Sequence, residues 1–175
     1  MKPSEYFHFC PRCGVQQAAP PAGNSFTCAA CGFTFFFSAA NATAAFVRRD
    51  DGRVLFIRRA KEPAKGKLAP PGGFVDIGET AEDAVRREIR EEVGLELTEI
   101  QFLCSHPNLY PYRDVSYPVL DFFFCARAVA AEQAKALDDV ASFCWLDLSE
   151  VSLEEIAFPS MRAALEQLRV ARSAT

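Results

Sequence analysis

The chain has 175 residues, of which 50% are hydrophobic and 24% charged, and its formal net charge is −4. This length allows one sizeable core with a small additional module. The acidic balance gives no general attraction to nucleic acid or to anionic membranes. The first ten residues contain no apolar signal segment, and the longest apolar run, 33–46, is interrupted by polar residues and too short to span a bilayer. We therefore expect a cytoplasmic protein that does not enter a membrane.

Two CxxC pairs, fourteen residues apart, stand out in the first forty residues. Each pair is followed by a glycine, which allows the positive φ that turns backbone amides toward the sulfurs. Two such pairs are typical of a structural zinc site, and the fourteen residues between them are just below the usual range of about 15–20. A redox role is the alternative, but two matched pairs in a reducing compartment favour metal binding. The predicted zinc ligands are Cys10, Cys13, Cys28 and Cys31.

The remaining cysteines, at positions 104, 125 and 144, lie singly among apolar residues and are interpreted as core residues. Residues 1–40 contain only Lys2, Arg12 and Glu5 as full charges. No basic stripe that could follow a phosphate backbone is present, so a structural role is preferred over nucleic-acid binding. We expect residues 1–38 to form a zinc ribbon.

From residue 43 the pattern is that of a larger domain. Two apolar segments, 43–49 and 53–59, flank "DDG", which predicts a β-hairpin. A loop rich in Lys, Gly and Pro follows. Thr80 then begins a helix as its N-cap, with Asp83 three residues on, and Gly94 follows its last turn.

Further apolar segments lie near 100–104, 119–126 and 143–146, and an amphipathic helix is expected over about 160–170. The aromatics and prolines of "SHPNLYPYRDVSY" predict a loop between two of these segments. The expected architecture for residues 39–175 is an α+β fold, a mixed sheet sandwiched between helices.

The helix that begins at Thr80 places three carboxylates, Glu88, Glu91 and Glu92, on one face. A solvated face laced with salt bridges is the ordinary alternative. However, Glu88 and Glu92 form a like-charge pair four residues apart, and acids in a last turn oppose the helix dipole. The cluster therefore predicts a cation, and clustered carboxylate oxygens suit Mg²⁺ or Mn²⁺.

The stretch "GFVDIGETAEDAVRREIREEVGL", 73–95, matches the Nudix box without a gap. The chain resembles Nudix hydrolases over 40–175, and its first part resembles the zinc ribbon of NADH pyrophosphatases in that superfamily. The resemblance implies Mg²⁺-dependent hydrolysis of a nucleoside diphosphate linked to another group. It also implies a homodimer.

The resemblance assigns roles to individual residues. Glu88 and Glu92 would be the principal metal ligands, helped by the Gly72 carbonyl, and Glu91 would be a further ligand or the general base. Glu79 and Arg87 would pair to hold loop and helix together, and Gly73 and Gly94 complete the motif. A later acid often completes such a metal site, and Asp139, with Asp138 beside it, is the candidate. A loop carboxylate that solvates a turn is the alternative for Asp139.

NADH pyrophosphatases carry a Ser-Gln-Pro-Trp-Pro-Phe-Pro signature after the box, and "SHPNLYP" matches it in part. Tyr110, Tyr112 and Tyr117 could stack a nicotinamide or adenine ring, or only pack a loop or a dimer contact. The expected substrate is a dinucleotide such as NADH or ADP-ribose. The alternatives are an oxidised nucleoside triphosphate, a capped RNA end, and a catalytically silent sensor whose ribbon binds nucleic acid or protein.

Overall fold

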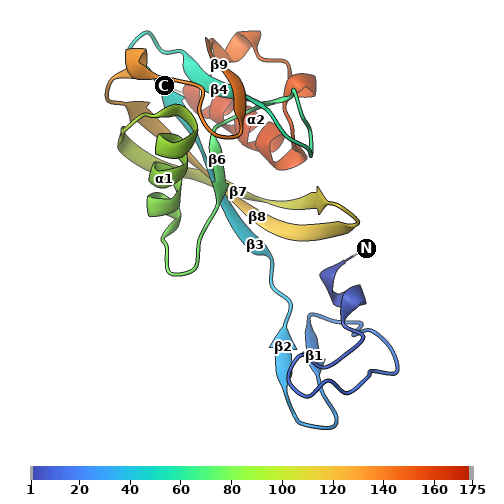
Figure 1. Ribbon diagram of the computed structural model, residues 1–175. Coiled ribbons are helices and arrows are strands. Elements are labelled where there is room, and N and C mark those ends of the chain that lie inside the picture. The colour runs from blue at the N-terminus through green and yellow to red at the C-terminus, as the bar shows by residue number, and fades with distance from the viewer. Residues whose placement is uncertain (1, 174–175) are drawn as a thin grey trace. The chain divides into compact units, whose positions relative to one another are not determined.

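The computed structural model describes residues 2–173 and divides into two compact units. The smaller unit contains the residues up to Ala40 together with Leu109–Val119, and the remaining described residues form the larger unit. Figure 1 labels the main elements of each. In the part of the chain that the structure describes, no helix is long and apolar enough to cross a membrane.

A seven-stranded sheet forms the body of the larger unit. Its strand order is β5-β4-β3-β8-β7, with β6 paired to β3 and β9 paired to β4. The strands are β3 (Ala40–Arg48), β4 (Val54–Arg59), β5 (Leu68–Ala69), β6 (Gly72–Phe74), β7 (Leu97–Tyr112), β8 (Val115–Ala128) and β9 (Val140–Leu146). The predicted hairpin is confirmed, since β3 and β4 pair in antiparallel fashion across the turn that contains Gly52.

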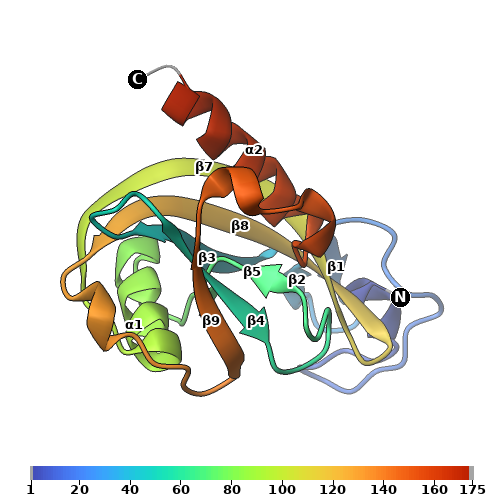
Figure 2. The same ribbon diagram turned by 90° about the horizontal axis from the view of Figure 1, so that it is seen from above.

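Two helices, α1 (Ala81–Val93) and α2 (Pro159–Ser173), cover opposite faces of this sheet (Figure 2). Alternate residues of β3 make the two cores: Phe46 packs with the α2 side and Val47 with the α1 side. Because both faces are covered, β3 and β4 are apolar at consecutive positions rather than at every second one. The predicted sandwich is therefore confirmed. Short 3₁₀ turns complete the chain: η1 (Pro3–Tyr6), η2 (Ala131–Gln133), η3 (Leu148–Glu150) and η4 (Leu153–Glu155).

The ends of α1 are set by the residues that the sequence indicates. The Thr80 side chain accepts a hydrogen bond from the Asp83 amide at 3.1 Å and so caps the first turn. Gly94 ends the helix at φ 68°, a left-handed conformation that glycine adopts without strain. Val85 and Ile89 are fully buried against the sheet, which leaves the acidic positions on another face.

The predicted loop "SHPNLYPYRDVSY" is wrong: these residues belong to β7 and β8, which turn at Arg113 and Asp114. The prolines at positions 107 and 111 suggested a loop because proline cannot donate a ladder hydrogen bond. β7 lies at the end of the strand order, and an edge strand tolerates proline. The distal part of this hairpin, Leu109–Val119, is assigned to the smaller unit.

A buried polar cluster connects β8 with the start of α2. The Ser160 hydroxyl donates to the Asp121 carboxylate at 2.5 Å, the Asn108 side chain also hydrogen-bonds it, and His106 acts on it electrostatically. Burial raises the pKa of Asp121 in spite of these partners. His106 and Asn108 stand where the NADH pyrophosphatase signature has Gln and Trp. Both side chains interact with the buried carboxyl group of Asp121.

We expect Asp121→Asn to raise the melting temperature at pH 7. The folded state holds the Asp121 proton more tightly than the unfolded chain does. Its contribution to stability is therefore present below the ordinary carboxyl pKa and is lost as the pH rises through the raised value. Each kcal/mol relieved corresponds to about 2–4 °C for a chain of this size.

Thermal unfolding of the Asp121→Asn variant at a series of pH values tests this expectation. The gain should vanish at acidic pH, where the native carboxyl group is already protonated. Ser160→Ala is the opposite control, because it removes a donor to the ionised carboxylate and should destabilise the protein most near neutral pH. If the Asp121→Asn protein is less stable than the native one at pH 7, and by the same amount at pH 4, the result contradicts the assignment.

Candidate functional site

Arg87 lies at the centre of the acidic cluster and uses all five of its N–H donors. Its Nε and Nη2 atoms each bind one carboxylate oxygen of Glu79 at 3.0 Å, and Nη2 also donates to the Phe74 carbonyl at 3.0 Å. Its Nη1 atom donates to Glu88 at 2.7 Å and to Glu91 at 3.1 Å. The pair of Glu79 with Arg87 that the Nudix resemblance implies is therefore present, and it lowers the pKa of Glu79.

Glu88 depends on the glycine beside it. A Cβ atom built on Gly73 would lie 2.5 Å from the Glu88 carboxyl carbon, closer than side chains approach. Only a glycine at this position leaves the carboxylate room. Burial raises the pKa of Glu88, with repulsion from Glu91 and Glu79 adding to the shift and Arg87 opposing it.

Glu92 is the most buried of the three acids, with 8% of its surface exposed. Its carboxylate accepts a hydrogen bond from the Gly72 amide at 2.9 Å, so the contact to Gly72 that the structure records is through nitrogen. Burial raises the pKa of Glu92 to about 8, and repulsion from Glu88 and Asp138 adds to the shift. The role of the Gly72 carbonyl as a metal ligand stays a prediction.

The segment before β9 lies against the end of α1. The Leu137 amide donates to the Glu92 carbonyl at 2.9 Å, and the Ala60 amide donates to the Asp139 carbonyl at 3.0 Å. The Asp139 carboxylate forms an ion pair with Lys61, whereas Asp138 acts electrostatically on Glu92. Of the two candidates for a later metal ligand, Asp138 is the one whose charge acts on the buried acid, and the role of Asp139 as a ligand stays a prediction.

Arg59 is a further charged residue of this region that sequence reasoning missed. Its charge lowers the pKa of Glu92, its Nε donates to the Pro63 carbonyl at 2.8 Å, and its guanidinium lies 5.2 Å from the centre of the Phe158 ring. Arg59 lies in β4 and Asp138 just before β9, far along the sequence from the helix they act on. The signal in the sequence is a charged residue at the end of an apolar segment for Arg59, and one just before an apolar segment for Asp138.

The acidic cluster fits a hard divalent cation. It offers several carboxylate oxygens, which are the ligands such a cation prefers. Burial and repulsion from neighbouring carboxylates raise the pKa values of Glu88 and Glu92. Arg87 forms ion pairs with Glu88 and Glu91. Among residues 2–173, the only group of three or more potential ligands with donor atoms all within 4.8 Å is a set of four cysteines. The three carboxylates share a region of the larger unit but are more widely spread than those thiols.

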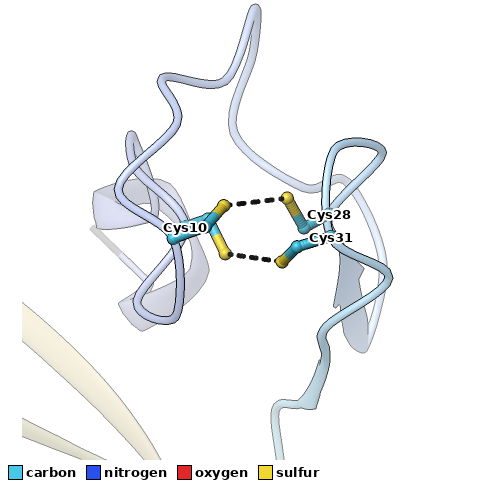
Figure 3. Close-up of side chains that lie close together, drawn as sticks. Cys10, Cys28 and Cys31 are labelled. Carbon is cyan, nitrogen blue, oxygen red and sulfur yellow. Dashed lines mark hydrogen bonds between the residues drawn. The ribbon is translucent and has the colours of Figure 1, made fainter.

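That set of cysteines is the predicted one, and its geometry fits zinc. Cys10 and Cys31 lie 3.8 Å apart at sulfur, and Cys13 and Cys28 lie 3.7 Å apart, with the sulfurs directed at a common centre (Figure 3). A tetrahedral ion with bonds of about 2.3 Å to sulfur requires separations of about 3.8 Å between the sulfurs. A disulfide would need about 2.05 Å, so the four thiols are free.

Two matched turns hold the thiols. In each, the glycine after the CxxC pair has a positive φ, 73° for Gly14 and 71° for Gly32, and its amide donates to the first cysteine's carbonyl. Burial raises the pKa of Cys10, but hydrogen bonds from the backbone of Cys13 and Arg12 outweigh it and lower the pKa to about 7. In spite of a backbone hydrogen bond from Val15, burial and the other three thiols raise the pKa of Cys13 to about 12, so the cluster can ionise fully only with a cation among the sulfurs.

The rest of the ribbon is stabilised by aromatic residues around these turns. Strands β1 (Ser25–Thr27) and β2 (Thr34–Phe36) pair in antiparallel fashion, and the Phe7 ring packs against those of Phe26 and Phe37 with centroids 5.7 and 4.7 Å apart. This core is small, so a metal ion bound by the four cysteines would supply much of its folding energy.

The predicted substrate-binding tyrosines belong to the smaller unit. Tyr110 and Tyr112 are on β7, and Tyr117 is on β8. Tyr112 is 51% exposed, and the Arg113 guanidinium lies 5.5 Å from the centre of its ring. A contact between these rings and a substrate stays a prediction.

Comparison with known proteins identifies the family of the chain. A family model described as the NUDIX domain matches residues 39–168. The chain is 37% identical over 121 residues to an ADP-ribose pyrophosphatase of Methanocaldococcus jannaschii, an alignment that covers 68% of each chain. It is 32% identical over 111 residues to an NAD-capped RNA hydrolase of Chromobacterium violaceum, covering 62% of this chain and 41% of that protein. It is 34% identical over 103 residues to a mitochondrial NAD(P)H pyrophosphatase of Homo sapiens, of which it spans 29%.

Solved structures show the same fold. A MutT NUDIX hydrolase from Burkholderia pseudomallei has a TM-score of 0.64 at 27% identity, covering 75% of this chain and 98% of that one. A NUDIX hydrolase from Nitrosomonas europaea has a TM-score of 0.70 at 19% identity and covers 99% of this chain and 93% of that one. With the family model spanning most of the larger unit and the acids of α1 arranged as described, the chain belongs to the Nudix family.

Proposed function

We propose that the protein hydrolyses the pyrophosphate linkage of a nucleoside diphosphate derivative, with ADP-ribose and NADH-type dinucleotides as the preferred substrates. The observation that carries the proposal is the helix face formed by Glu88, Glu91 and Glu92, of which Glu92 is buried and Glu88 partly buried, both with raised pKa values. The names of the relatives from Methanocaldococcus jannaschii and Homo sapiens support the choice of substrate class.

Glu88 and Glu92 would hold Mg²⁺ or Mn²⁺, with Glu91 as a further ligand or as the general base. A divalent ion bound there would offset the charge of the pyrophosphate and lower the pKa of water. Burial favours the neutral form of Glu92 and Glu88 in the metal-free site, and a divalent cation would favour their ionised form. Arg87 and Glu79 keep β6, which carries Gly73, and the segment after it against the helix. Glu91 is half exposed, so it is the acid of the three that water reaches most easily.

The wider setting follows from the same proposal. The protein would work in the cytoplasm as a homodimer, with a structural zinc ion on the ribbon. An RNA that begins with an NAD-type cap presents the same pyrophosphate linkage, and the relative from Chromobacterium violaceum bears the name of such a hydrolase. This substrate is the second candidate.

A substrate panel with Mg²⁺ tests the proposal. ADP-ribose, NADH, an NAD-capped RNA oligonucleotide and an oxidised nucleoside triphosphate would be compared by kcat/KM, with both phosphorylated products resolved by chromatography. Two nucleoside or sugar monophosphates from ADP-ribose or NADH support the proposal. Turnover of only the triphosphate, with release of inorganic pyrophosphate, contradicts it.

Tyr110→Ala is expected to raise KM for the preferred dinucleotide by about one to two orders of magnitude, as for the loss of one stacked base. The change in kcat should be smaller, because stacking stabilises the bound ground state as much as the transition state. Steady-state kinetics measure both parameters, and light scattering checks that the variant keeps the oligomeric state of the native protein. Tyr110→Phe, which keeps the ring, is the control and should stay near the native KM. An unchanged KM in a folded Tyr110→Ala variant makes this ring structural.

A further inference from the structure

The guanidinium of Arg87 does two different things with its two sides. The Nε–Nη2 edge binds Glu79 through two hydrogen bonds and also reaches the Phe74 carbonyl, which ties the helix to the loop after β6. The Nη1 group donates instead to Glu88 and Glu91. These two hydrogen bonds take up oxygen atoms that a divalent cation needs as ligands.

The contact of Arg87 Nη1 with Glu88 and Glu91 lies where solvent screens charges weakly, so it opposes the binding of a cation. Glu88 is 16% exposed at its side chain and Arg87 is 27% exposed, so water screens their interaction poorly. A cation that binds beside Glu88 and Glu91 meets the positive charge of Nη1 at short range, and like charges repel most strongly where solvent is scarce. The arginine and the divalent ion therefore compete for the same two carboxylates.

We propose that Arg87 is the resident counter-ion of Glu88 and Glu91, and that its Nη1 group leaves them when a divalent cation binds while its other edge stays on Glu79. Arg87 thus sets the metal concentration at which the site fills. It is a positioning residue in the sense that it acts through the acids. The inference rests on the metal-dependent function proposed above.

The test is binding of Mn²⁺ to the full-length, zinc-loaded protein without substrate, followed by the electron paramagnetic resonance signal of free Mn²⁺. We expect Arg87→Gln to lower the Kd for Mn²⁺ about tenfold, because the competing charge is gone. A purely structural role predicts the opposite, since loss of the tie to Glu79 would loosen the site.

Arg90→Gln is the matched control. It removes the same charge from the same helix, but Arg90 pairs with Glu96 and is 58% exposed at its side chain, so the Kd should stay within about twofold. Glu79→Gln weakens the tie to the loop and leaves the Nη1 contacts in place, and it should not tighten Mn²⁺ binding. Tighter binding in Arg87→Gln alone supports the proposal, and a Kd equal to or above that of Arg90→Gln overturns it.

Two further measurements keep the result decisive. If Arg87→Gln does not fold, as judged by circular dichroism, Arg87→Met takes its place, because methionine also removes the charge and its flexible, unbranched side chain adapts to the space. A folded Arg87→Met that binds Mn²⁺ no more tightly than the native protein overturns the proposal. A native protein that binds no Mn²⁺ at all rejects the proposed metal-dependent function instead, so the two failures are distinguishable.

Discussion

Glu92→Gln is expected to lower kcat at least about a hundredfold while the protein stays folded. Its carboxylate is buried, its pKa is raised to about 8, and Glu88 and Asp138 repel its charge, so the protein tolerates this anion only at a cost. A buried carboxylate of this kind is expected where a protein binds a cation. Loss of one preorganised group that stabilises the charge of the transition state typically lowers kcat by about 10²–10³. Steady-state kinetics at saturating Mg²⁺ measure the effect.

The fold should survive this change for two reasons. Glutamine keeps an oxygen that can accept the hydrogen bond from the Gly72 amide, and it removes a buried charge. The melting temperature should therefore be equal to or above that of the native protein. Glu82→Gln is the control, an exposed acid in the first turn of the same helix, and it should leave kcat unchanged. If both Glu91→Gln and Glu92→Gln turn over substrate at the native rate, the assignment of these acids to a metal centre is wrong.

Removal of zinc is expected to unfold the ribbon and leave much of the larger unit intact. The apolar core around Cys10, Phe26 and Cys28 is small, and structural zinc in such modules contributes about 10–16 kcal/mol of binding free energy that is also folding free energy. Metal analysis of the reduced protein should find one zinc ion per chain. After chelation or in Cys28→Ser, hydrogen exchange should lose its protection in residues 2–40, whereas α1 and β4 stay protected.

A cysteine outside the site provides the control for that experiment. Cys144 is partly buried in β9 and does not belong to the group of four thiols whose donor atoms lie within 4.8 Å of one another. Cys144→Ser should keep its zinc and the protection of the ribbon. A reduced preparation without zinc, or a disulfide across either CxxC pair, contradicts the metal assignment.

The parts of this site that were predictable from sequence are those that depend on local spacing. Thr80, Gly94 and the acids between them belong to a single helix, so the helical period fixes which of them share a face. The two CxxC pairs are likewise short turns, each ended by a glycine at positive φ. In both cases a few adjacent residues carry all the information that the geometry needs.

The parts that were not predictable depend on segments far apart in the chain. Asp138 and Arg59 act on Glu92 only because the strands that carry their segments, β9 and β4, pair with one another. The length of β7 and β8 was missed for another reason: the prolines argued for a loop, and nothing in the local sequence shows that β7 lies at a sheet edge. Such effects are properties of the tertiary structure.

The close approach of Glu88 to Gly73 limits which residues strand β6 can carry at position 73. A single methyl group at position 73 would occupy the volume in which the Glu88 carboxyl group lies. The side chain would then have to rotate away, although every ionisable group of the protein would still be present. At this position the site is therefore limited by space rather than by charge, and a change of Gly73 to alanine, which alters no charge, would displace a carboxylate that we propose as a metal ligand.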